Sequence, residues 1–322
     1  MVHLWAFGGR VDGRGASSFR QGSDSGRSNP VCRESEILAW ETDASGLSGP
    51  ESTPQHVISQ SVQDHAYPKW CIFRNGWMDV NSRKSLEIAK SQTLIREEWI
   101  PHLETAAREA GTRIMEIHQQ GAQAEFKNDG SPVTEADRAA EEVILSALNQ
   151  MASEIPVVSE ENAESHHLDP PETFFLVDPL DGTKEFLRPD GQGSFTVNIA
   201  LIEKMEPVLG VIFAPALDRM FHGFKGGGSV EKSLGREGPI QIRQLPESGS
   251  RAVASRSHRN EETNRWLEAH QIRETVSIGS SLKFCLVACG EADVYPRFGP
   301  TMEWDTAAGD AILRAAGGLT TH

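Results

Sequence analysis

Apolar residues recur every three or four positions along two stretches of the chain, and this period predicts two amphipathic helices. The first helix is expected to begin near Ser91, to contain Pro101 as a start or a kink, and to end at Gly121. The second is expected to follow Thr134 and Asp137, which resemble a capping box with Asp in place of the usual Glu or Gln. The apolar positions are Trp99, Leu103, Ala106, Ala107, Ala110, Ile114 and Ile117 in the first helix and Ala140, Val143, Ile144, Ala147, Leu148 and Met151 in the second.

Short apolar runs bounded by turn residues follow the second helix and predict strands. The first two are residues 155–158 and 174–177. Residues 195–201, 208–213 and 220–221 come next, with turn residues between them. This part of the chain therefore predicts an antiparallel meander.

The last third of the chain shows strand and helix patterns in alternation. Residues from about 230 to 250 are polar, and we interpret them as a connection. The later patterns predict strands at residues 252–254, 275–278 and 294–297 and helices that open at residues 280–283 and 304–309. The strand-helix-strand order indicates an α/β second domain. We expect an N-terminal α+β domain at residues 91–249 and a C-terminal α/β domain at residues 250–322.

Residues 1–90 differ from the rest because they show no sustained period of two or 3.6 residues. The first fifty residues hold eight glycines and eight serines. Such a segment buries too little apolar surface to offset its ordering entropy. We expect a poorly ordered N-terminal extension, and we assign it no function.

The composition, 38% hydrophobic and 24% charged, is typical of a soluble globular protein. The net charge of −15 argues against a nucleic-acid polymer as partner, because phosphate backbones require a basic surface. A small phosphorylated ligand remains compatible with an acidic protein if metal ions bridge the two. The four cysteines form no zinc-ligand pattern, so buried thiols are expected.

The compartment follows from what the sequence lacks. No apolar run is long enough for a transmembrane helix. Residues 1–9 are too short and too soon followed by Arg10 to form a secretory signal. We therefore expect a cytoplasmic protein, with peripheral association at the inner membrane as an alternative, and the oligomeric state stays open.

Residues 178–183, Asp-Pro-Leu-Asp-Gly-Thr, carry the clearest candidate chemistry. They follow a predicted buried strand directly, and their Pro and Gly predict a turn. The turn gathers two carboxylates, the Leu180 carbonyl and the Thr183 hydroxyl at one strand end. Oxygen ligands of this kind suit hard divalent cations, and Mg²⁺ usually combines a few carboxylates with substrate phosphate. The alternative is an acidic surface turn, since Asp-Gly turns are common.

Three more carboxylates, Asp137, Glu160 and Asp305, lie at predicted strand ends or helix starts. Crowded carboxylates repel one another, and either solvent or cations relieve the repulsion. On its own, Asp137 is better explained as a first-turn carboxylate that the helix dipole stabilises. The adjacent Glu160 and Glu161 are by themselves explained as solvated surface.

Residues 178–183, the Glu160–Glu161 pair and residues 304–309 resemble the three signature segments of the lithium-sensitive, Mg²⁺-dependent phosphatases of the inositol monophosphatase superfamily. The resemblance covers roughly residues 95–322. It implies a layered α+β or α/β sandwich of the inositol monophosphatase and fructose bisphosphatase type, with alternating helix and sheet layers. Against the family pattern the carboxyl-terminal edge is truncated, which implies an exposed sheet edge and a weaker second domain.

Within the superfamily, six further segments are similar to the CysQ-type 3′(2′),5′-bisphosphate nucleotidases. They are residues 127–134, 184–186, 193–198, 255–258, 280–285 and 295–300. This branch implies hydrolysis of adenosine 3′,5′-bisphosphate to AMP and phosphate, which clears a by-product of sulfate assimilation. The alternatives are an inositol or other sugar monophosphate phosphatase of the same fold, a non-catalytic nucleotide or metal sensor, and an unrelated acidic protein with coincidental motifs.

The resemblance also implies a role for each matching residue. Two or three Mg²⁺ ions would be held by four carboxylates and one carbonyl: Glu160, Asp178, the Leu180 carbonyl, Asp181 and Asp305. Glu160 would also take part in catalysis, while Asp137 and Thr183 would orient and deprotonate the attacking water. Gly182, Thr183 and Asp305 would contact the substrate, with the amides near Gly182 at the scissile phosphate.

Lys283 and Arg297 would bind the second phosphate of a small nucleotide bisphosphate, because a simple sugar phosphate would give them nothing to bind. Ser280 would add a hydroxyl or amide contact, and His258 would lie near the base or the ribose. From spacing alone, the two cations are better explained as ordinary surface charges, and His258 is as well explained as a satisfied structural histidine.

Overall fold

The computed structural model describes residues 2–5, 80–127, 130, 132–167, 171–188 and 193–321. The poorly ordered extension expected for residues 1–90 therefore lies mostly outside the described residues. Two parts of it are described: the strand β1 (Val2–Trp5) and the first turns of the helix α1 (Val80–Gln120). The helix thus begins earlier than the expected Ser91, and Pro101 lies inside it rather than at its start.

The two helices predicted at the start of the family-like region are confirmed. α1 ends at Gln120, directly before Gly121, which adopts a left-handed φ of 81°. Such a residue commonly terminates a helix. α2 (Glu135–Ala152) begins with the predicted capping box. Thr134 Oγ1 accepts from the main-chain nitrogen of Ala136, and Asp137 Oδ2 accepts from the main-chain nitrogen of Thr134. A short pairing of β2 (Glu125–Phe126) with β3 (Pro132–Val133) connects the helices.

A seven-stranded sheet follows, in the strand order β10-β9-β8-β7-β6-β5-β4. From β5 to β10 every neighbouring pair is antiparallel, so the predicted meander is confirmed. β4 alone lies parallel to its neighbour β5. The strands are β4 (Val157–Ser159), β5 (Thr173–Asp181), β6 (Thr196–Glu203), β7 (Glu206–Ala214), β8 (Arg219–Phe224), β9 (Gly228–Ser233) and β10 (Arg236–Ile240), with the short helices η1 (Ala163–His167), α3 (Thr183–Phe186) and η2 (Pro215–Leu217) between them.

A five-stranded sheet has the order β12-β11-β13-β1-β14. β11 lies parallel to β12 and β13, while β1 is antiparallel to β13 and β14. Helices alternate with its strands, as the sequence predicts for an α/β arrangement. The elements are β11 (Arg251–Ser255), α4 (Glu261–Ala269), β12 (Glu274–Ile278), α5 (Leu282–Ala288), β13 (Val294–Arg297), α6 (Ala307–Ala315) and β14 (Leu319–Thr321).

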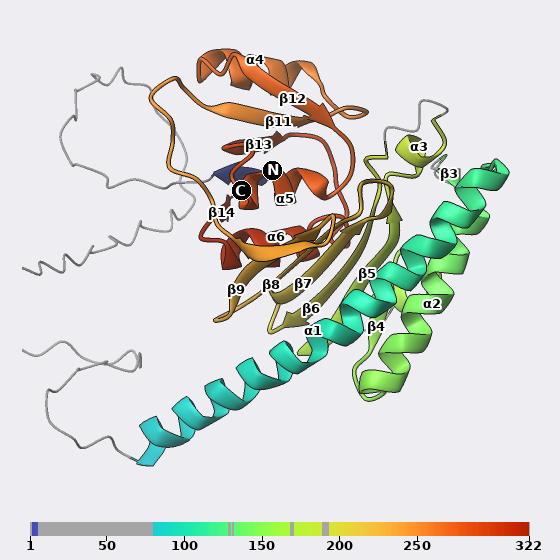
Figure 1. The fold of residues 1–322 in the computed structure, drawn as a ribbon, viewed down its shortest axis with the longest axis vertical. Coiled ribbons are helices and arrows are strands. Elements are labelled where there is room, and N and C mark those ends of the chain that lie inside the picture. Colours follow the sequence, from blue (N-terminus) through green and yellow to red (C-terminus); the bar gives the residue numbers. More distant parts are fainter. Residues whose placement is uncertain are drawn as a thin grey trace, which may run out of the picture. The chain divides into compact units, whose positions relative to one another are not determined.

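Helix and sheet layers alternate, which confirms the layered fold expected from the sequence. Figure 1 shows α1 and α2 side by side along one face of the seven-stranded sheet. The opposite face packs against α5 and α6, which also contact residues of the five-stranded sheet. α4 contributes Leu267 to a small cluster with Ala252 and Val294 of that second sheet.

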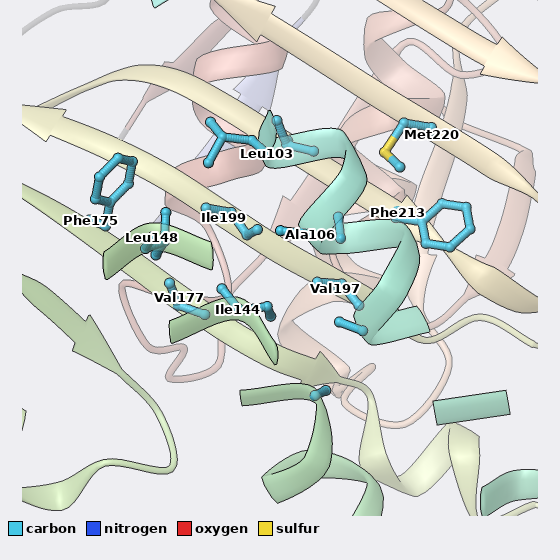
Figure 2. Packing of buried hydrophobic residues seen from close by; sticks show 14 of the residues in the cluster. Leu103, Ala106, Ile144, Leu148, Phe175, Val177, Val197, Ile199, Phe213 and Met220 are labelled. Carbon is cyan, nitrogen blue, oxygen red and sulfur yellow. The ribbon is translucent and has the colours of Figure 1, made fainter. Parts of the chain in front are cut away.

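The strand β5 is buried on both faces, which explains its unbroken apolar sequence. Phe175 and Val177 face α1 and α2, together with Ile144 of α2 (Figure 2). Phe174 and Leu176, the alternate residues, face α5 and α6. Burial of this strand in both cores fixes the position of its carboxyl end, where the candidate site begins.

The prediction that residues 230–250 form only a connection is wrong. The structure places the hairpin β9–β10 there, at the edge of the seven-stranded sheet. Its two-residue turn, Leu234 and Gly235, has φ values of 49° and 74°, as a type I′ turn requires. The turn was missed because Leu occupies the position where Asn or Asp would signal it, and the polar side chains of an edge hairpin hide the strand period.

All the described residues belong to one unit. The predicted division into domains at residues 249 and 250 falls between the last strand of one sheet and the first strand of the other, and it stays a prediction. None of the described helices is long and apolar enough to cross a membrane.

Candidate functional site

A cavity of about 690 Å³ lies where β5 ends and loops of the five-stranded sheet begin. Both sheets line it, together with the segment that precedes α6. Every site residue predicted from the sequence lines this cavity except Asp137: Glu160, Asp178, Leu180, Asp181, Gly182, Thr183, His258, Ser280, Lys283, Arg297 and Asp305. The structure therefore brings together predicted residues that lie far apart in the sequence, from Glu160 to Asp305.

A β-bulge brings the two carboxylates of β5 to the same place. Asp178 pairs with Asn198 and Asp181 with Thr196, so three steps along β5 match two steps along β6. In a regular strand, residues three apart point to opposite faces. The extra residue of a bulge restores a common direction. The segment before α6 adds Asp305, and oxygens of Asp178, Asp181 and Asp305 lie within 4.8 Å of one another.

The electrostatics of this cluster favour a cation. Asp178 is 1% exposed, and its Oδ2 has no hydrogen-bond partner within the described part of the chain. Burial and the charges of Glu160, Asp181 and Asp305 raise its pKa well above the usual range. Burial and the charge of Asp305 raise the pKa of Asp181 to about 6. An orphaned oxygen among three clustered carboxylates fits a divalent cation, whose charge would offset both the burial and the repulsion.

Glu160 lies at the end of β4 and is held by Lys127, whose role the sequence reasoning missed. The Lys127 Nζ atom lies 3.0 Å from Glu160 Oε1 and 2.7 Å from Glu161 Oε1. Burial raises the pKa of Glu160 to about 7, although the ammonium of Lys127 opposes the shift. Glu160 is not one of the three carboxylates whose oxygens lie within 4.8 Å. The contact of Glu160 with a metal ion therefore stays a prediction. In this structure the carboxylate of Glu160 pairs with the ammonium of Lys127.

Thr183 and Asp137 form a pair beside the cluster. Thr183 Oγ1 lies 3.2 Å from Asp137 Oδ1 and 3.3 Å from the carbonyl oxygen of Leu180. Asp137 Oδ2 accepts from the main-chain nitrogen and the hydroxyl of Thr134, both at 2.7 Å. Burial raises the pKa of Asp137, while the bonds from Thr134 oppose the shift. The capping box thus fixes one carboxylate oxygen and leaves the other toward Thr183.

Gly182 makes the turn from β5 into α3. Its φ of 93° is left-handed, and a Cβ there would lie 3.4 Å from the carbonyl oxygen of Ser194. Glycine adopts this conformation at little cost. The first N–H groups of a helix have no partner within the helix. Those of α3 therefore open beside the carboxylate cluster, where the sequence predicts the scissile phosphate.

Lys283 and Arg297 also line the cavity, and neither has a carboxylate partner among the described residues. Lys283 is 4% exposed, donates to the Ser280 carbonyl, and lies over the ring of Tyr295 with its Nζ 5.2 Å from the centroid. Arg297 donates to the carbonyls of Gly299, at 3.4 Å, and Pro300, at 2.6 Å. Neither forms an ion pair with any residue that the structure describes. Burial lowers the pKa of Lys283 to about 8, despite the charge of Asp181.

His258 and Ser280 occupy two loops of the same wall. The main-chain nitrogen of His258 donates to Ser255 Oγ at 3.0 Å. Burial and the charges of Arg297 and Lys184 lower the pKa of His258. Ser280 has a φ of 52°, which is unusual for a residue other than glycine. Its side chain accepts from the Leu282 nitrogen at 3.3 Å, so the hydroxyl caps the turn into α5.

Several residues of the site were not predicted to have a role. Ser281 and Asn198 both bond Asp181. Trp304 stacks on His166 at 4.9 Å and thereby connects η1 to the segment that carries Asp305. Ser281 and Trp304 lie inside motifs that the sequence does reveal, so adjacency to a predicted ligand was the available signal.

Comparison with known proteins gives a consistent result. The model of the inositol monophosphatase family matches residues 95–322. The 3′(2′),5′-bisphosphate nucleotidase CysQ of Salmonella typhimurium is 48% identical over 221 residues, which are 66% of this chain and 85% of that protein. CysQ of Escherichia coli K12 is 45% identical with the same coverage.

Solved structures agree with this. The crystal structure of CysQ from Bacteroides thetaiotaomicron, a bacterial member of the inositol monophosphatase family, is 39% identical, with a TM-score of 0.56 over 67% of this chain and 85% of that one. The inositol monophosphatase from Anabaena is 26% identical, with a TM-score of 0.55 over 69% and 82% of the two chains.

Proposed function

The chain belongs to the inositol monophosphatase family, and from this we propose that it is a 3′(2′),5′-bisphosphate nucleotidase that hydrolyses adenosine 3′,5′-bisphosphate to AMP and phosphate. The identity to the CysQ nucleotidases supports the reaction. One structural observation carries the substrate class: Lys283 and Arg297 line the same cavity as the carboxylate cluster, and neither has a carboxylate partner among the described residues. These two cations would bind a second phosphoryl group beside the one at the carboxylate cluster.

The carboxylate cluster would hold the metal, which we propose is Mg²⁺, as two or three ions. Asp178, Asp181 and Asp305 supply the oxygens that already lie close together. Glu160 and the Leu180 carbonyl would complete the ligands. A divalent cation there supplies Lewis-acid stabilisation of the phosphoryl group and lowers the pKa of a nearby water.

Thr183 and Asp137 would accept the proton of the attacking water. The Thr183 hydroxyl can donate its own proton to Asp137 Oδ1, 3.2 Å away, as it takes one from the water. The raised pKa of Asp137 brings its basicity closer to neutral pH, where general-base catalysis is most efficient. The Thr134 bonds keep the carboxylate fixed during this transfer.

The remaining residues would bind and orient the two phosphates. The first N–H groups of α3 would contact the scissile 3′-phosphate, as helix N-termini do with anions. Lys283 and Arg297 would contact the 5′-phosphate, with Ser280 beside them. His258 would lie near the base or the ribose. Phosphoryl transfer needs positioning and charge neutralisation more than covalent help from the protein.

The second candidate is an inositol or sugar monophosphate phosphatase, which the structural similarity to inositol monophosphatases favours. Inorganic phosphate release from adenosine 3′,5′-bisphosphate and from inositol 1-phosphate, each with Mg²⁺, separates the two. We expect kcat/KM to be at least about 100-fold higher for the bisphosphate, since two charged hydrogen bonds contribute roughly 3 kcal/mol or more. Faster release from inositol 1-phosphate would favour the second candidate. Tight nucleotide binding without release from either substrate would indicate a sensor.

A further inference from the structure

We propose that Ser281 is a positioning residue that orients Asp181 for cation binding and ties it to Asp305. The inference rests on the proposed function, because it concerns the same metal-binding cluster. Ser281 lies at the start of α5 and is 2% exposed. Asp178 and Asp181 lie on β5, and Asp305 lies in the segment before α6. Ser281 therefore connects a third element, α5, to the site.

The contacts of Ser281 converge on one oxygen of Asp181. Its main-chain nitrogen lies 2.6 Å from Asp181 Oδ2, and its hydroxyl bonds the same oxygen. The hydroxyl also lies 2.6 Å from the carbonyl oxygen of Asp305. Asn198 Nδ2 lies 2.8 Å from the hydroxyl oxygen and 3.4 Å from Asp181 Oδ2. One serine thereby contacts two of the three clustered carboxylate residues.

The two oxygens of the Asp181 carboxylate have different hydrogen-bond environments. Oδ2 accepts from the Ser281 nitrogen and hydroxyl and from Asn198, whereas Oδ1 has no donor among the residues described. Hydrogen bonds to a ligating carboxylate fix its orientation and tune its basicity. Because the bonds on Oδ2 fix the carboxylate, Oδ1 can bind a cation without losing a hydrogen bond to a described residue.

The hydroxyl has a single proton but two acceptors, Asp181 Oδ2 and the Asp305 carbonyl. Because it has only this proton, it can donate to one of them at a time, and its oxygen accepts from Asn198. The Ser281 N–H holds Asp181 in either case. The hydroxyl can therefore shift toward the Asp305 carbonyl when a cation takes up the negative charge of Asp181, without releasing the carboxylate.

The backbone around Ser281 is constrained by an unusual conformation and by contacts with neighbouring segments. Ser280, the preceding residue, has the left-handed φ of 52°. Such a conformation costs a non-glycine residue on the order of 1 kcal/mol or more, and it persists where the surroundings enforce it. Gly279 provides the enforcement: its nitrogen donates to Ser194 Oγ at 3.2 Å, and a Cβ on it would lie 2.5 Å from Glu185 Cγ. The turn is thus packed against α3 and the loop that precedes β6.

The test compares Ser281→Ala with the matched control Ser229→Ala. Ser229 is also buried, and its hydroxyl donates to the Ile312 carbonyl at 2.7 Å, outside the cavity. Both variants lose a buried hydroxyl, so a general loss of stability affects both. Mn²⁺ binding to the full chain is measured by electron paramagnetic resonance without substrate, and the KM for adenosine 3′,5′-bisphosphate is measured at saturating Mg²⁺.

We expect Ser281→Ala to weaken Mn²⁺ binding about 10- to 100-fold, as the loss of an outer partner of a metal ligand does, while KM changes less than about threefold. Ser229→Ala should bind Mn²⁺ as the unmodified protein does. Unchanged Mn²⁺ affinity in Ser281→Ala overturns the inference, and a raised KM with unchanged affinity would make Ser281 a substrate contact instead.

A second variant keeps the test decisive if Ser281→Ala does not fold. Asn198→Ala removes the donor to the same hydroxyl and to Asp181, and it too should weaken Mn²⁺ binding. Unchanged affinity in that variant overturns the inference. The proposed function fails separately: an unmodified protein that binds Mn²⁺ yet releases no phosphate contradicts the activity but leaves the role of Ser281 standing.

Discussion

The hydroxyl oxygen of Thr183 lies 3.2 Å from Oδ1 of Asp137, although 46 positions of sequence separate the two residues. α2 carries the aspartate and α3 carries the threonine. The strand β5 connects them in space, because it is buried against α2 and ends directly before Gly182. A capping box thereby supplies the proposed base, and the start of α3 supplies the hydroxyl.

Thr183→Val should lower kcat about 100-fold or more, because positioned proton transfer contributes roughly that factor. The KM for the bisphosphate should change little, since the two substrate phosphates keep their partners. Thr112→Val is the matched control: Thr112 is exposed on α1, and its hydroxyl donates to the Arg108 carbonyl, at 2.9 Å, outside the cavity. Steady-state kinetics of both variants check this, and a Thr183→Val enzyme with the kcat of the control would remove Thr183 and Asp137 from the chemistry.

Lys283 should make substrate binding depend on pH. Because burial lowers its pKa to about 8, the free enzyme loses the ammonium charge as the pH rises above that value. The KM for adenosine 3′,5′-bisphosphate should therefore rise between about pH 8 and pH 10. Lys283→Arg should flatten this rise, since arginine stays charged. Lys283→Ala should show a KM raised about tenfold or more already at neutral pH.

Two observations would contradict that prediction. One is a KM profile of Lys283→Arg that rises as steeply as that of the unmodified enzyme. The other is an equal loss of activity of Lys283→Ala on bisphosphate and monophosphate substrates. Lys225→Ala serves as the control, because Lys225 is exposed and pairs with Glu206 at the surface, outside the cavity.

Much of the site could be predicted because its residues follow from local rules. The pair Thr134 and Asp137 shows the spacing of a capping box, and Asp178 and Asp181 lie where an apolar run meets Pro and Gly. Short apolar runs separated by turn residues predicted the antiparallel meander. Family resemblance then connected these segments with Asp305, which no local pattern relates to them.

What could not be predicted depends on tertiary contacts. The bulge that brings Asp178 and Asp181 together is visible only in the pairing of β5 with β6. The bond from Lys127 to Glu160 joins a loop to a strand end, and nothing in either segment specifies the other. The hairpin β9–β10 was missed because its side chains are mostly polar and only partly buried, so no alternation of apolar and polar residues marks its strands.

The metal-free protein should lose stability as the pH rises from about 4 to about 7. Burial raises the pKa of Glu160 to about 7 and that of Asp181 to about 6, from 4.5 and 3.8. The folded state therefore binds more protons than the unfolded state in this range, so raising the pH favours unfolding. Thermal denaturation with a chelator at the two ends of the range measures the effect. A rise in melting temperature toward neutral pH would contradict it.

Asp178→Asn should make the metal-free protein more stable at neutral pH, because it replaces an acid whose ionised form is disfavoured by burial and whose Oδ2 has no partner among the described residues. The same substitution should abolish most of the stabilisation that Mg²⁺ gives to the unmodified protein. Denaturation with and without Mg²⁺ checks both effects. Equal stabilisation of both proteins by Mg²⁺ would show that the ion binds elsewhere.

Gly210 should be required for the position of α6. A Cβ at this position of β7 would lie 2.2 Å from the carbonyl oxygen of Ala308, which cannot move without the helix. Gly210→Ala should lower the free energy of unfolding by about 1–3 kcal/mol, as overpacking of a core does. It should also weaken metal binding, because Asp305 lies only two residues before the first residue of α6. Gly238→Ala is the control, since no atom lies within 4 Å of its added Cβ. A Gly210→Ala protein as stable as this control would contradict the packing argument.

Asp178, Asp181 and Asp305 together should hold a divalent cation. Anomalous X-ray scattering from a crystal of the full chain soaked in Mn²⁺ locates such an ion. We expect an anomalous peak within direct coordination distance of an oxygen from each of the three carboxylates. An anomalous map without a peak at this cluster, under conditions in which the enzyme is active with Mn²⁺, would contradict it.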